Sequence, residues 1–389
     1  MNLDKEQQEA VERACSSRFS IINGGAGCGK TTIIREICKG VANPRLCAFT
    51  GKAAARIREA TGFEASTIHR MLGYNGDGFL VNSLSGKDIV IDEASMLDTD
   101  LLYAIMERGP SRLVLVGDEA QLPPVGSGQP FHDIVRNRPD LVTTLKTCYR
   151  ASGAVHKAAN AIRGGFAPQM RDTSGEEWWE IVQSGADSAT HNAILEMVRN
   201  REIDFTRDAI LVPKNSDSPC TVDTLNRDIC DIVNPHSDGE RFRPNDRVMC
   251  LKNHPELDVW NGTTGSVEAC GSNWMVFRPD SPVRNSDGEL VDEVDIPQGA
   301  MPDFQLAYAM TVHKAQGSQY NTVVFAALCR DTFMLLDRSM LYTAVTRAKK
   351  RCVIAGQYRA IQDAIRNSRT KHTVMQYLFE MEKQHVQHV

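Results

Sequence analysis

A glycine-rich stretch near the start of the chain, INGGAGCGKTT at residues 22–32, restricts the possible folds more than any other feature of the sequence. The residues from Gly24 to Thr31 fit the spacing G-x-x-x-x-G-K-[ST] of a phosphate-binding loop. The apolar run FSII at 19–22 precedes the loop, and TTIIREICKG at 31–40 follows it with the pattern of a helix. Strand, glycine loop and helix in this order predict an α/β fold that binds a nucleoside triphosphate.

The residue types of this loop suit phosphate chemistry. Glycines let backbone N–H groups approach phosphate oxygens, and the N-terminus of the following helix adds partial positive charge. Lys30 is expected to reach the β- and γ-phosphates, and Thr31 to bind Mg²⁺ through its hydroxyl group. A glycine turn with an unrelated lysine is the alternative. The nucleotide-binding residues expected here are Gly24, Gly25, Ala26, Gly27, Cys28, Gly29, Lys30, Thr31 and Thr32.

Two further apolar strands supply the remaining parts of an ATP site. KDIVIDEAS at 87–95 ends in an acidic pair, which a parallel sheet places on its ligand side. Asp92 is expected to hold Mg²⁺, and Glu93 to polarise the attacking water; a solvated acidic pair is the alternative. RLVLVGD at 112–118 continues into EAQLPP, where Gln121 can sense the γ-phosphate. We therefore expect ATP and Mg²⁺ as cofactors.

Length, charge and cysteine content limit the class of protein. A chain of 389 residues is long enough for two or three domains. A net charge of −5 indicates a local groove, and not a generally basic surface, for any nucleic-acid contact. The 11 cysteines show no C-x-x-C pair, which favours reduced core thiols over a zinc site. The polar first residues and the lack of a long apolar run predict a cytoplasmic protein without a membrane partner.

Motifs along nearly the whole chain, in order, resemble those of superfamily 1 DNA helicases of the RecD and Dda type, the branch that moves 5′ to 3′. The matching strings are LDKEQQEAV (3–11), GGAGCGKT (24–31), TGKAAAR (50–56), STIHR (66–70), DEAS (92–95), GDEAQLPPV (117–125), YAMTVHKAQGSQ (308–319) and LYTAVTRAKK (341–350). Phe49 stands where proline is usual, and residues 166–208 match nothing in the family.

The resemblance implies roles for residues that the sequence alone would leave open. Gln7 would read adenine, Gly317 would contact the nucleotide, and Arg150 and Arg347 would supply guanidinium groups to the transferring phosphoryl group. On its own, either arginine would be interpreted as part of a surface ion pair. The expected contacts to single-stranded DNA are Thr50, Lys52, His69, Phe79, Lys214, Thr311, His313 and Gln316.

The order of strand and helix patterns, together with the resemblance, predicts two RecA-like parallel-sheet lobes with two insertions. The first lobe is expected over 1–147, with a short strand-separating pin at about 70–87. The second is expected over 148–243 and 304–389, with FQLAYAM at 304–310 as one of its strands and a helix in VMQYLFEMEK at 374–383. Short strands at 244–303 predict a small antiparallel barrel, and the family implies an SH3-like one.

Aromatic residues are the candidates for the strand-separating wedge. Phe79 lies in the pin segment and either stacks on a base or packs into its own lobe, with Tyr74 as the second candidate. Trp260 is expected in the barrel core, with contact to DNA as the alternative, and Trp178 and Trp179 are assigned to packing.

The expected function is ATP-dependent unwinding of DNA with 5′ to 3′ movement on a single strand. A DNA-stimulated ATPase that translocates without unwinding, and an RNA motor, are the alternatives; a binding module without catalysis fits poorly with the intact motifs. The expected partners are single-stranded and forked DNA, with a single-strand-binding, replication or recombination protein left open. One chain holds both halves of the ATP site, so a monomer suffices.

Overall fold

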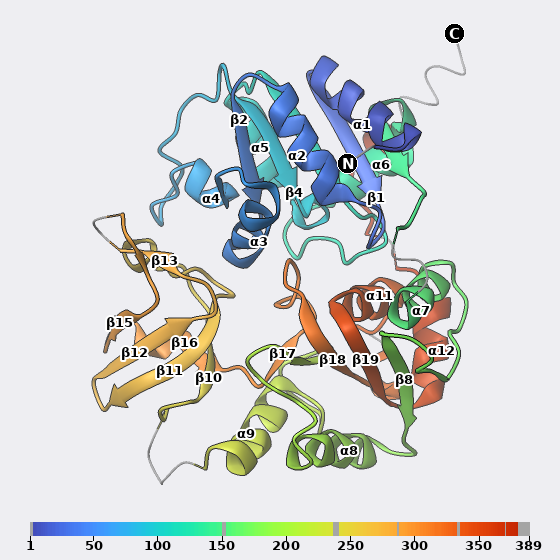
Figure 1. Cartoon of the computed structure of the whole chain (residues 1–389), viewed down its shortest axis with the longest axis vertical. Helices are drawn as coiled ribbons and strands as arrows, with labels where there is room; N and C mark the ends of the chain where they lie inside the picture. The colour runs from blue at the N-terminus through green and yellow to red at the C-terminus, as the bar shows by residue number, and fades with distance from the viewer. Residues whose placement is uncertain are drawn as a thin grey trace. The chain divides into compact units, whose positions relative to one another are not determined.

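The computed structural model describes residues 3–149, 153–235, 241–285, 288–332, 335–369 and 371–379. They form two compact units, one of residues 1–151 with 369–389 and the other of residues 152–368. Figure 1 labels the helices and strands of both units, and each unit is described separately below. None of the helices within the described ranges is long and apolar enough to cross a lipid bilayer.

The first unit is built on a six-stranded parallel sheet in the order β3-β2-β4-β5-β1-β6. This arrangement confirms the predicted α/β class, and the strands expected around residues 20, 90 and 115 are all present. The strands are β1 (Phe19–Gly24), β2 (Pro44–Ala48), β3 (Ala65–Thr67), β4 (Asp88–Asp92), β5 (Arg112–Gly117) and β6 (Val142–Leu145).

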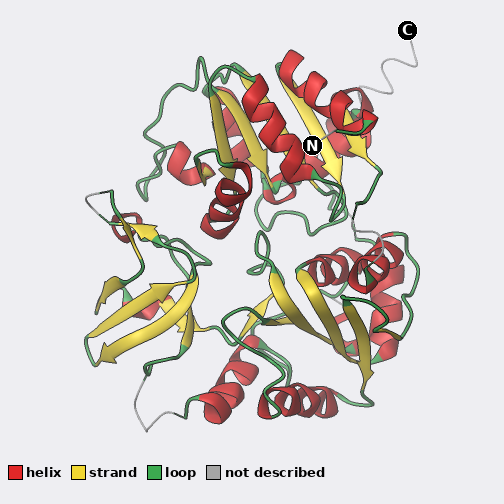
Figure 2. Cartoon of the chain, viewed as in Figure 1, coloured by secondary structure: helices red, strands yellow, loops and turns green. Residues whose placement is uncertain are grey.

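Helices pack on both faces of this sheet because alternate strand residues point to opposite sides. In β4, Val90 packs with α1, α2 and α3, while Ile89 and Ile91 pack with α5 and α6. Figure 2 shows these helices in red beside the yellow strands. The helices are α1 (Lys5–Ser16), α2 (Lys30–Gly40), α3 (Gly51–Thr61), α4 (Ile68–Met71), α5 (Thr99–Glu107) and α6 (Pro130–Asn137), with 3₁₀ turns at η1 (Ala94–Met96) and η2 (Pro139–Leu141).

Within the segment at about 70–87 that was expected to be the pin, residues 72–81 form a small hairpin. Tyr74 and Phe79 face each other in an antiparallel bridge, and the N–H of Leu80 donates to the carbonyl of Gly73 at 3.1 Å. The side chain of Leu80 is 66% exposed, whereas Phe79 packs against the core of the unit. The assignment of this hairpin as a strand-separating pin stays a prediction.

The second unit contains a six-stranded sheet in the order β17-β9-β18-β19-β8-β7, parallel except for the edge strand β7. Its strands are β7 (Arg171–Asp172), β8 (Trp178–Gln183), β9 (Ala209–Val212), β17 (Ala309–Thr311), β18 (Tyr320–Ala327) and β19 (Ala348–Gly356). Its helices are α7 (Ala154–Arg163), α8 (Asp187–Arg199), α9 (Val222–Val233), α10 (Cys329–Thr332), α11 (Arg338–Thr346) and α12 (Tyr358–Arg366). Branched residues of β9, β18 and β19 form a core with α8 and α9.

A five-stranded antiparallel sheet, β15-β12-β11-β10-β16, occupies the predicted insertion and has its own apolar core. Its strands are β10 (Arg247–Cys250), β11 (Thr264–Gly271), β12 (Trp274–Pro279), β15 (Val294–Pro297) and β16 (Phe304–Leu306), and β13 (Val283–Arg284) pairs with β14 (Leu290–Val291). Two 3₁₀ turns, η3 (Pro255–Leu257) and η4 (Met301–Asp303), lie in the same segment. The SH3-like character of this sheet stays a prediction.

The structure corrects the prediction of a single strand at 304–310. Residues 304–306 form β16 and pair antiparallel with β10, whereas residues 309–311 form β17 and pair parallel with β9. Ala307 and Tyr308 lie between the two strands, and both are buried. The sequence shows one apolar run because both halves are buried, and only the pairing partners distinguish them.

The segment after residue 369 was expected in the second lobe, but it packs on the first unit. Lys371 donates to the carbonyl of Pro124, and the Thr373 hydroxyl donates to Asp133 at 2.5 Å. Residues 374–379 are helical, and Met375 and Phe379 pack against the core on the α5 and α6 face. Helical spacing of apolar residues predicted a helix at 374–383; residues 374–379 confirm it, and 380–383 lie outside the described residues. That spacing carries no information on which lobe the helix covers.

Candidate active site

The phosphate-binding loop lies between β1 and α2 in the first unit, as predicted. Gly27 and Gly29 have φ angles of 82° and 79°, in the left-handed region that residues with a Cβ atom rarely adopt. The ammonium group of Lys30 donates to the carbonyls of Gly24 and Gly25 at 2.6 and 2.9 Å. The loop therefore holds its lysine at the mouth of the glycine turn, beside the first N–H groups of α2.

Gln7 and Tyr149 lie beside Gly29 on one side of this loop. A Cβ atom on Gly29 would come within 2.5 Å of the Gln7 amide nitrogen and 3.6 Å of the Tyr149 ring. The Tyr149 hydroxyl donates to Asp4, which raises the pKa of Tyr149 to about 12. Tyr149 is half-exposed and neutral. Sequence reasoning did not single it out, although it directly precedes Arg150.

The acidic pair lies at the end of β4, as predicted. Glu93 has a φ of 55°, and both carboxylates are almost completely buried. Burial raises the pKa of Asp92, as does the Glu93 carboxylate, and the charges of Arg56 and Lys30 oppose that rise. The Arg56 guanidinium lies 3.1 Å from Glu93 and 3.7 Å from Asp92. Sequence reasoning missed Arg56, although it is the last residue of the quoted TGKAAAR string.

The residues expected to bind Mg²⁺ offer the oxygen donors that this ion prefers. Thr31 supplies a hydroxyl group in the first turn of α2, and Asp92 a carboxylate at the end of β4. In the part of the chain that the structure describes, no three His, Cys, Asp or Glu side chains form a group that could hold a metal. This donor set fits an ion that takes its other ligands from nucleotide phosphates and water.

The loop after β5 places Gln121 next to the phosphate-binding loop. The N–H of Glu119 donates to the side-chain oxygen of Asn23, the residue before Gly24, at 3.1 Å. Gln121 is buried, and its side-chain oxygen has no hydrogen-bond partner. An unsatisfied buried amide oxygen is costly, so this side chain is suited to a ligand that donates a hydrogen bond, such as a water molecule beside the γ-phosphate.

His132 of α6 contacts the loop that carries Gln121. Because this histidine is buried, we expect the stability of the protein to depend on pH. Its Nε2 contacts the carbonyl of Gln121 at 3.3 Å, and burial lowers the pKa of His132 to about 4. The pKa of His132 in the folded chain lies below the ordinary histidine value of about 6.5. As the pH falls from about 6.5 to about 4, His132 therefore binds a proton in the unfolded chain but stays neutral in the folded chain. The unfolding free energy of the protein therefore decreases as the pH falls through this range.

We expect wild-type protein to lose about 2 kcal/mol more unfolding free energy than a His132→Leu variant between pH 7.5 and pH 5. Denaturant titrations at both pH values measure this difference. His372→Gln, which changes an exposed histidine of the same unit, is the matched control and should behave as wild type. Equal losses in wild type and His132→Leu would contradict the prediction.

The DNA-contact candidates of the first unit lie at the start of α3 and in a cluster of aromatic rings. Thr50 caps α3 by accepting from the N–H of Ala53 at 3.2 Å. The His69 ring lies 6.3 Å from Phe49, 5.5 Å from Tyr74 and 6.1 Å from Phe79. Burial lowers the pKa of His69, so the ring is neutral at pH 7. Phe49, which replaces the usual proline, thus supports His69.

Phe79 is held within this cluster and does not project from the hairpin. Its ring centroid lies 5.6 Å from that of Tyr74, and the Arg108 guanidinium carbon lies 5.5 Å from it. These contacts agree with the alternative in which Phe79 packs into its own lobe.

The late motifs place their candidates in the second unit. Thr311 ends β17, and Gln316 is buried in the turn that follows, while His313 is half-buried. Gly317 has a φ of 75°, so the turn itself requires a glycine. Arg347 is buried, and its guanidinium donates to the Thr343 and Ser318 carbonyls and to the Thr346 hydroxyl at 3.2, 3.3 and 3.2 Å. Arg150 lies outside the described residues.

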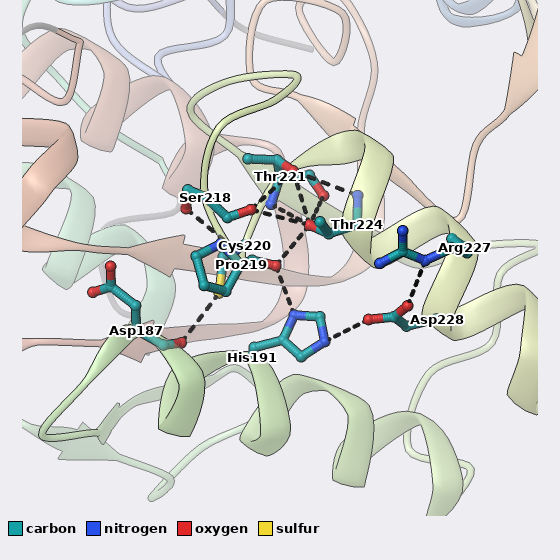
Figure 3. Close-up of polar contacts among 9 residues, drawn as sticks. All are labelled: Asp187, His191, Ser218, Pro219, Cys220, Thr221, Thr224, Arg227 and Asp228. Carbon is teal, nitrogen blue, oxygen red and sulfur yellow. Dashed lines mark hydrogen bonds and ion pairs between the residues drawn. The ribbon is translucent and has the colours of Figure 1, made fainter.

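Lys214 is the second residue of the loop at 213–221. Side chains and carbonyl groups anchor this loop between α8 and α9. Figure 3 shows His191 in contact with the Pro219 carbonyl at 2.7 Å and with Asp228 at 2.9 Å. The Thr224 hydroxyl donates to the same carbonyl at 2.7 Å. Lys214 itself lies 3.4 Å from the buried carboxylate of Asp331. Its ammonium group therefore neutralises an acid of its own unit.

The tryptophans match their expected positions only in part. Trp179 is fully buried and donates to the Gln169 carbonyl at 2.7 Å, as its assignment to packing predicted. Trp178 is 37% exposed, with the guanidinium carbons of Arg171 and Arg351 5.6 and 4.8 Å from its ring. Trp260 was expected in the barrel core, but it is only half-buried, and its indole N–H donates to Asp258 at 3.0 Å.

Comparison with known families agrees with this arrangement of motifs. Residues 2–178 match a family described as an AAA domain, and residues 306–355 match the UvrD-like helicase C-terminal domain. The two matched segments contain the phosphate loop with the acidic pair and the late motifs, respectively.

The curated relatives cover almost the whole chain. It is 31% identical to the ATP-dependent RecD2 DNA helicase of Deinococcus radiodurans over 94% of its length, and it spans about half of that protein (51%). It is 30% identical to the RecD subunit of the RecBCD enzyme of Mycolicibacterium smegmatis, with 95% of this chain and 74% of that protein covered. With the RecD subunit of Mycobacterium tuberculosis, the identity is 32% over 92% of this chain and 70% of the relative.

Solved structures show the same fold at lower identity. A Pif1 helicase studied in DNA unwinding at forked double-stranded DNA matches with a TM-score of 0.56 and 18% identity, with 100% of this chain and 98% of that one covered. The Bacteroides Pif1 helicase bound to single-stranded DNA matches with a TM-score of 0.52, the same identity and the same coverage.

Proposed function

Because the chain belongs to the RecD-type superfamily 1 DNA helicases, we propose that it uses ATP hydrolysis to move 5′ to 3′ along single-stranded DNA and to separate a duplex ahead of it. The observation that carries the proposal is the convergence of four motifs in the first unit. Gln7, the phosphate loop, the Asp92–Glu93 pair and the Gln121 loop lie around the carboxyl ends of β1, β4 and β5.

Each residue of this cluster has a defined task in phosphoryl transfer. Lys30 and the loop N–H groups neutralise the phosphate charges, and Gln7 and Tyr149 lie where the base would be held. Glu93 orients and polarises the attacking water, and Gln121 senses the γ-phosphate through a water molecule that donates to its unsatisfied side-chain oxygen. Thr31 and Asp92 would hold Mg²⁺, which supplies charge stabilisation when bound.

The second unit contributes the arginine of the late motif and part of the DNA path. Arg347 is proposed to stabilise the transferring phosphoryl group, and Arg150 to assist it. ATP and its products would then favour different conformations of the protein, because they make different contacts with these arginines. A ligand shifts a conformational equilibrium only through such differences in contact. The proposed contacts to the single strand are Thr50, Lys52, His69, Lys214, Thr311, His313 and Gln316.

One observation favours a translocase with little unwinding as the second candidate function. The hairpin at 72–81 is short, and its aromatic ring packs into the lobe, so Leu80 is its exposed apolar residue. A hairpin whose exposed apolar residue is aliphatic offers less stacking to a base pair than one with an exposed aromatic ring.

An unwinding assay on forked duplexes separates these possibilities. We expect release of the displaced strand from a fork with a 5′ tail and not from one with a 3′ tail, with ATP hydrolysis stimulated by DNA more than by an RNA of the same sequence. Strand movement without release supports the translocase, and stronger stimulation by RNA supports an RNA motor. Release from the 3′-tailed fork alone would contradict the direction.

A further inference from the structure

The contact between Arg56 and the acidic pair links two segments that are assigned different tasks. Arg56 belongs to α3, and its guanidinium lies 3.1 Å from a carboxylate oxygen of Glu93 and 3.7 Å from one of Asp92. Its side chain is 31% exposed, whereas that of Glu93 is 8% exposed. The proposed general base therefore makes a nearly buried ion pair with a helix that lies outside the phosphate loop.

The start of the same helix carries two of the proposed DNA contacts. Thr50 caps α3, and Lys52 lies in its first turn. Lys52 and Arg56 are four residues apart, so they lie on one face of the helix, about 6 Å apart along its axis. A short helix moves as one rigid piece. A phosphate of the strand that displaces Lys52 therefore displaces Arg56 as well.

We propose that Arg56 is the positioning residue through which single-stranded DNA at the start of α3 controls Glu93; this rests on the proposed function. Without DNA, the guanidinium holds the Glu93 carboxylate, whose oxygen then accepts from Arg56 and not from water. When a strand binds Thr50 and Lys52, α3 shifts, the ion pair loosens, and Glu93 turns to the attacking water. DNA therefore stimulates ATP hydrolysis, because Arg56 and the attacking water compete for the Glu93 carboxylate.

The test compares turnover with and without a single-stranded oligonucleotide in Arg56→Ala, Arg56→Gln and Arg56→Lys. In Arg56→Ala and Arg56→Gln, we expect the turnover without DNA to rise and the stimulation ratio to fall about fivefold or more, the low end of the usual range for coupling between sites. Affinities for a fluorescent ADP analogue and for the oligonucleotide, measured by anisotropy, should stay unchanged. Arg56→Lys retains a cation and should restore most of the ratio.

The matched control is Arg58→Ala. Arg58 lies on the same helix but about 200° around it from Arg56, so the variant removes a cation of α3 from a different face. It should retain the wild-type ratio. A variant of Arg56 that loses turnover equally in both states, or that has lower turnover without DNA than wild type, overturns the proposal. A wild-type protein that DNA does not stimulate shows instead that the proposed function itself fails.

Discussion

Replacing Lys30 with alanine is expected to abolish ATP hydrolysis, with a loss of about a hundredfold to a thousandfold or more, as for the removal of one preorganised charge from a transition state. The ammonium group lies 2.6 and 2.9 Å from the carbonyls of Gly24 and Gly25, so it is already oriented at the glycine turn. The loop otherwise offers neutral backbone groups, so they do not replace the positive charge of the lost ammonium group. Phosphate release at saturating ATP and oligonucleotide measures the effect.

Lys39→Ala provides the control for this prediction because it removes a lysine from the last turn of the same helix. Lys39 is exposed and pairs with Glu36 at 2.9 Å, and surface pairs of this kind contribute little to stability. We expect its turnover to match wild type. Hydrolysis by Lys30→Ala within about tenfold of the wild-type rate would contradict the role of the loop.

Replacing Glu93 with glutamine is expected to stop turnover while ATP still binds. The change keeps the size of the side chain and one oxygen, but it removes the charge that polarises water, and general bases contribute about 10²- to 10⁴-fold. Because Glu93 lies at the end of β4 and outside the phosphate loop, nucleotide affinity should change little. Anisotropy of a fluorescent ATP analogue and phosphate release measure the two quantities separately.

Glu59→Gln is the matched control, since it makes the same chemical change at an exposed position on α3. It should leave both quantities at their wild-type values. Loss of nucleotide binding in Glu93→Gln would assign Glu93 to the binding of the nucleotide, and turnover above a tenth of wild type would exclude it as the base.

Predictions that depend on neighbouring residues agree best with the structure. The glycine loop with its flanking strand and helix, and the acidic pair after a buried strand, are local patterns. Backbone geometry within a few residues decides them, so they can be found without the fold. Their assembly in one unit also follows from the sequence, because parallel strands with crossover helices bring successive carboxyl ends to one edge.

Predictions that depend on distant partners were incomplete or wrong. The apolar run at 304–310 divides between two sheets, and the helix at 374–379 covers the first unit. An apolar residue indicates burial but does not specify the surface that covers it, since the hydrophobic effect has no direction. For the same reason, the sequence could not decide whether Phe79 stacks on DNA or packs against Tyr74 and Arg108.

The sequence alone determined the local motifs of this protein: the glycine loop with its flanking strand and helix, the acidic pair after a buried strand, and the family that shares them. Only the tertiary structure decided how those residues are held. The ion pair between Arg56 and Glu93 joins positions 37 residues apart, and His132 contacts the loop of Gln121 from another helix. Spacing encodes local backbone geometry, whereas such contacts exist only after the sheet brings separate segments together.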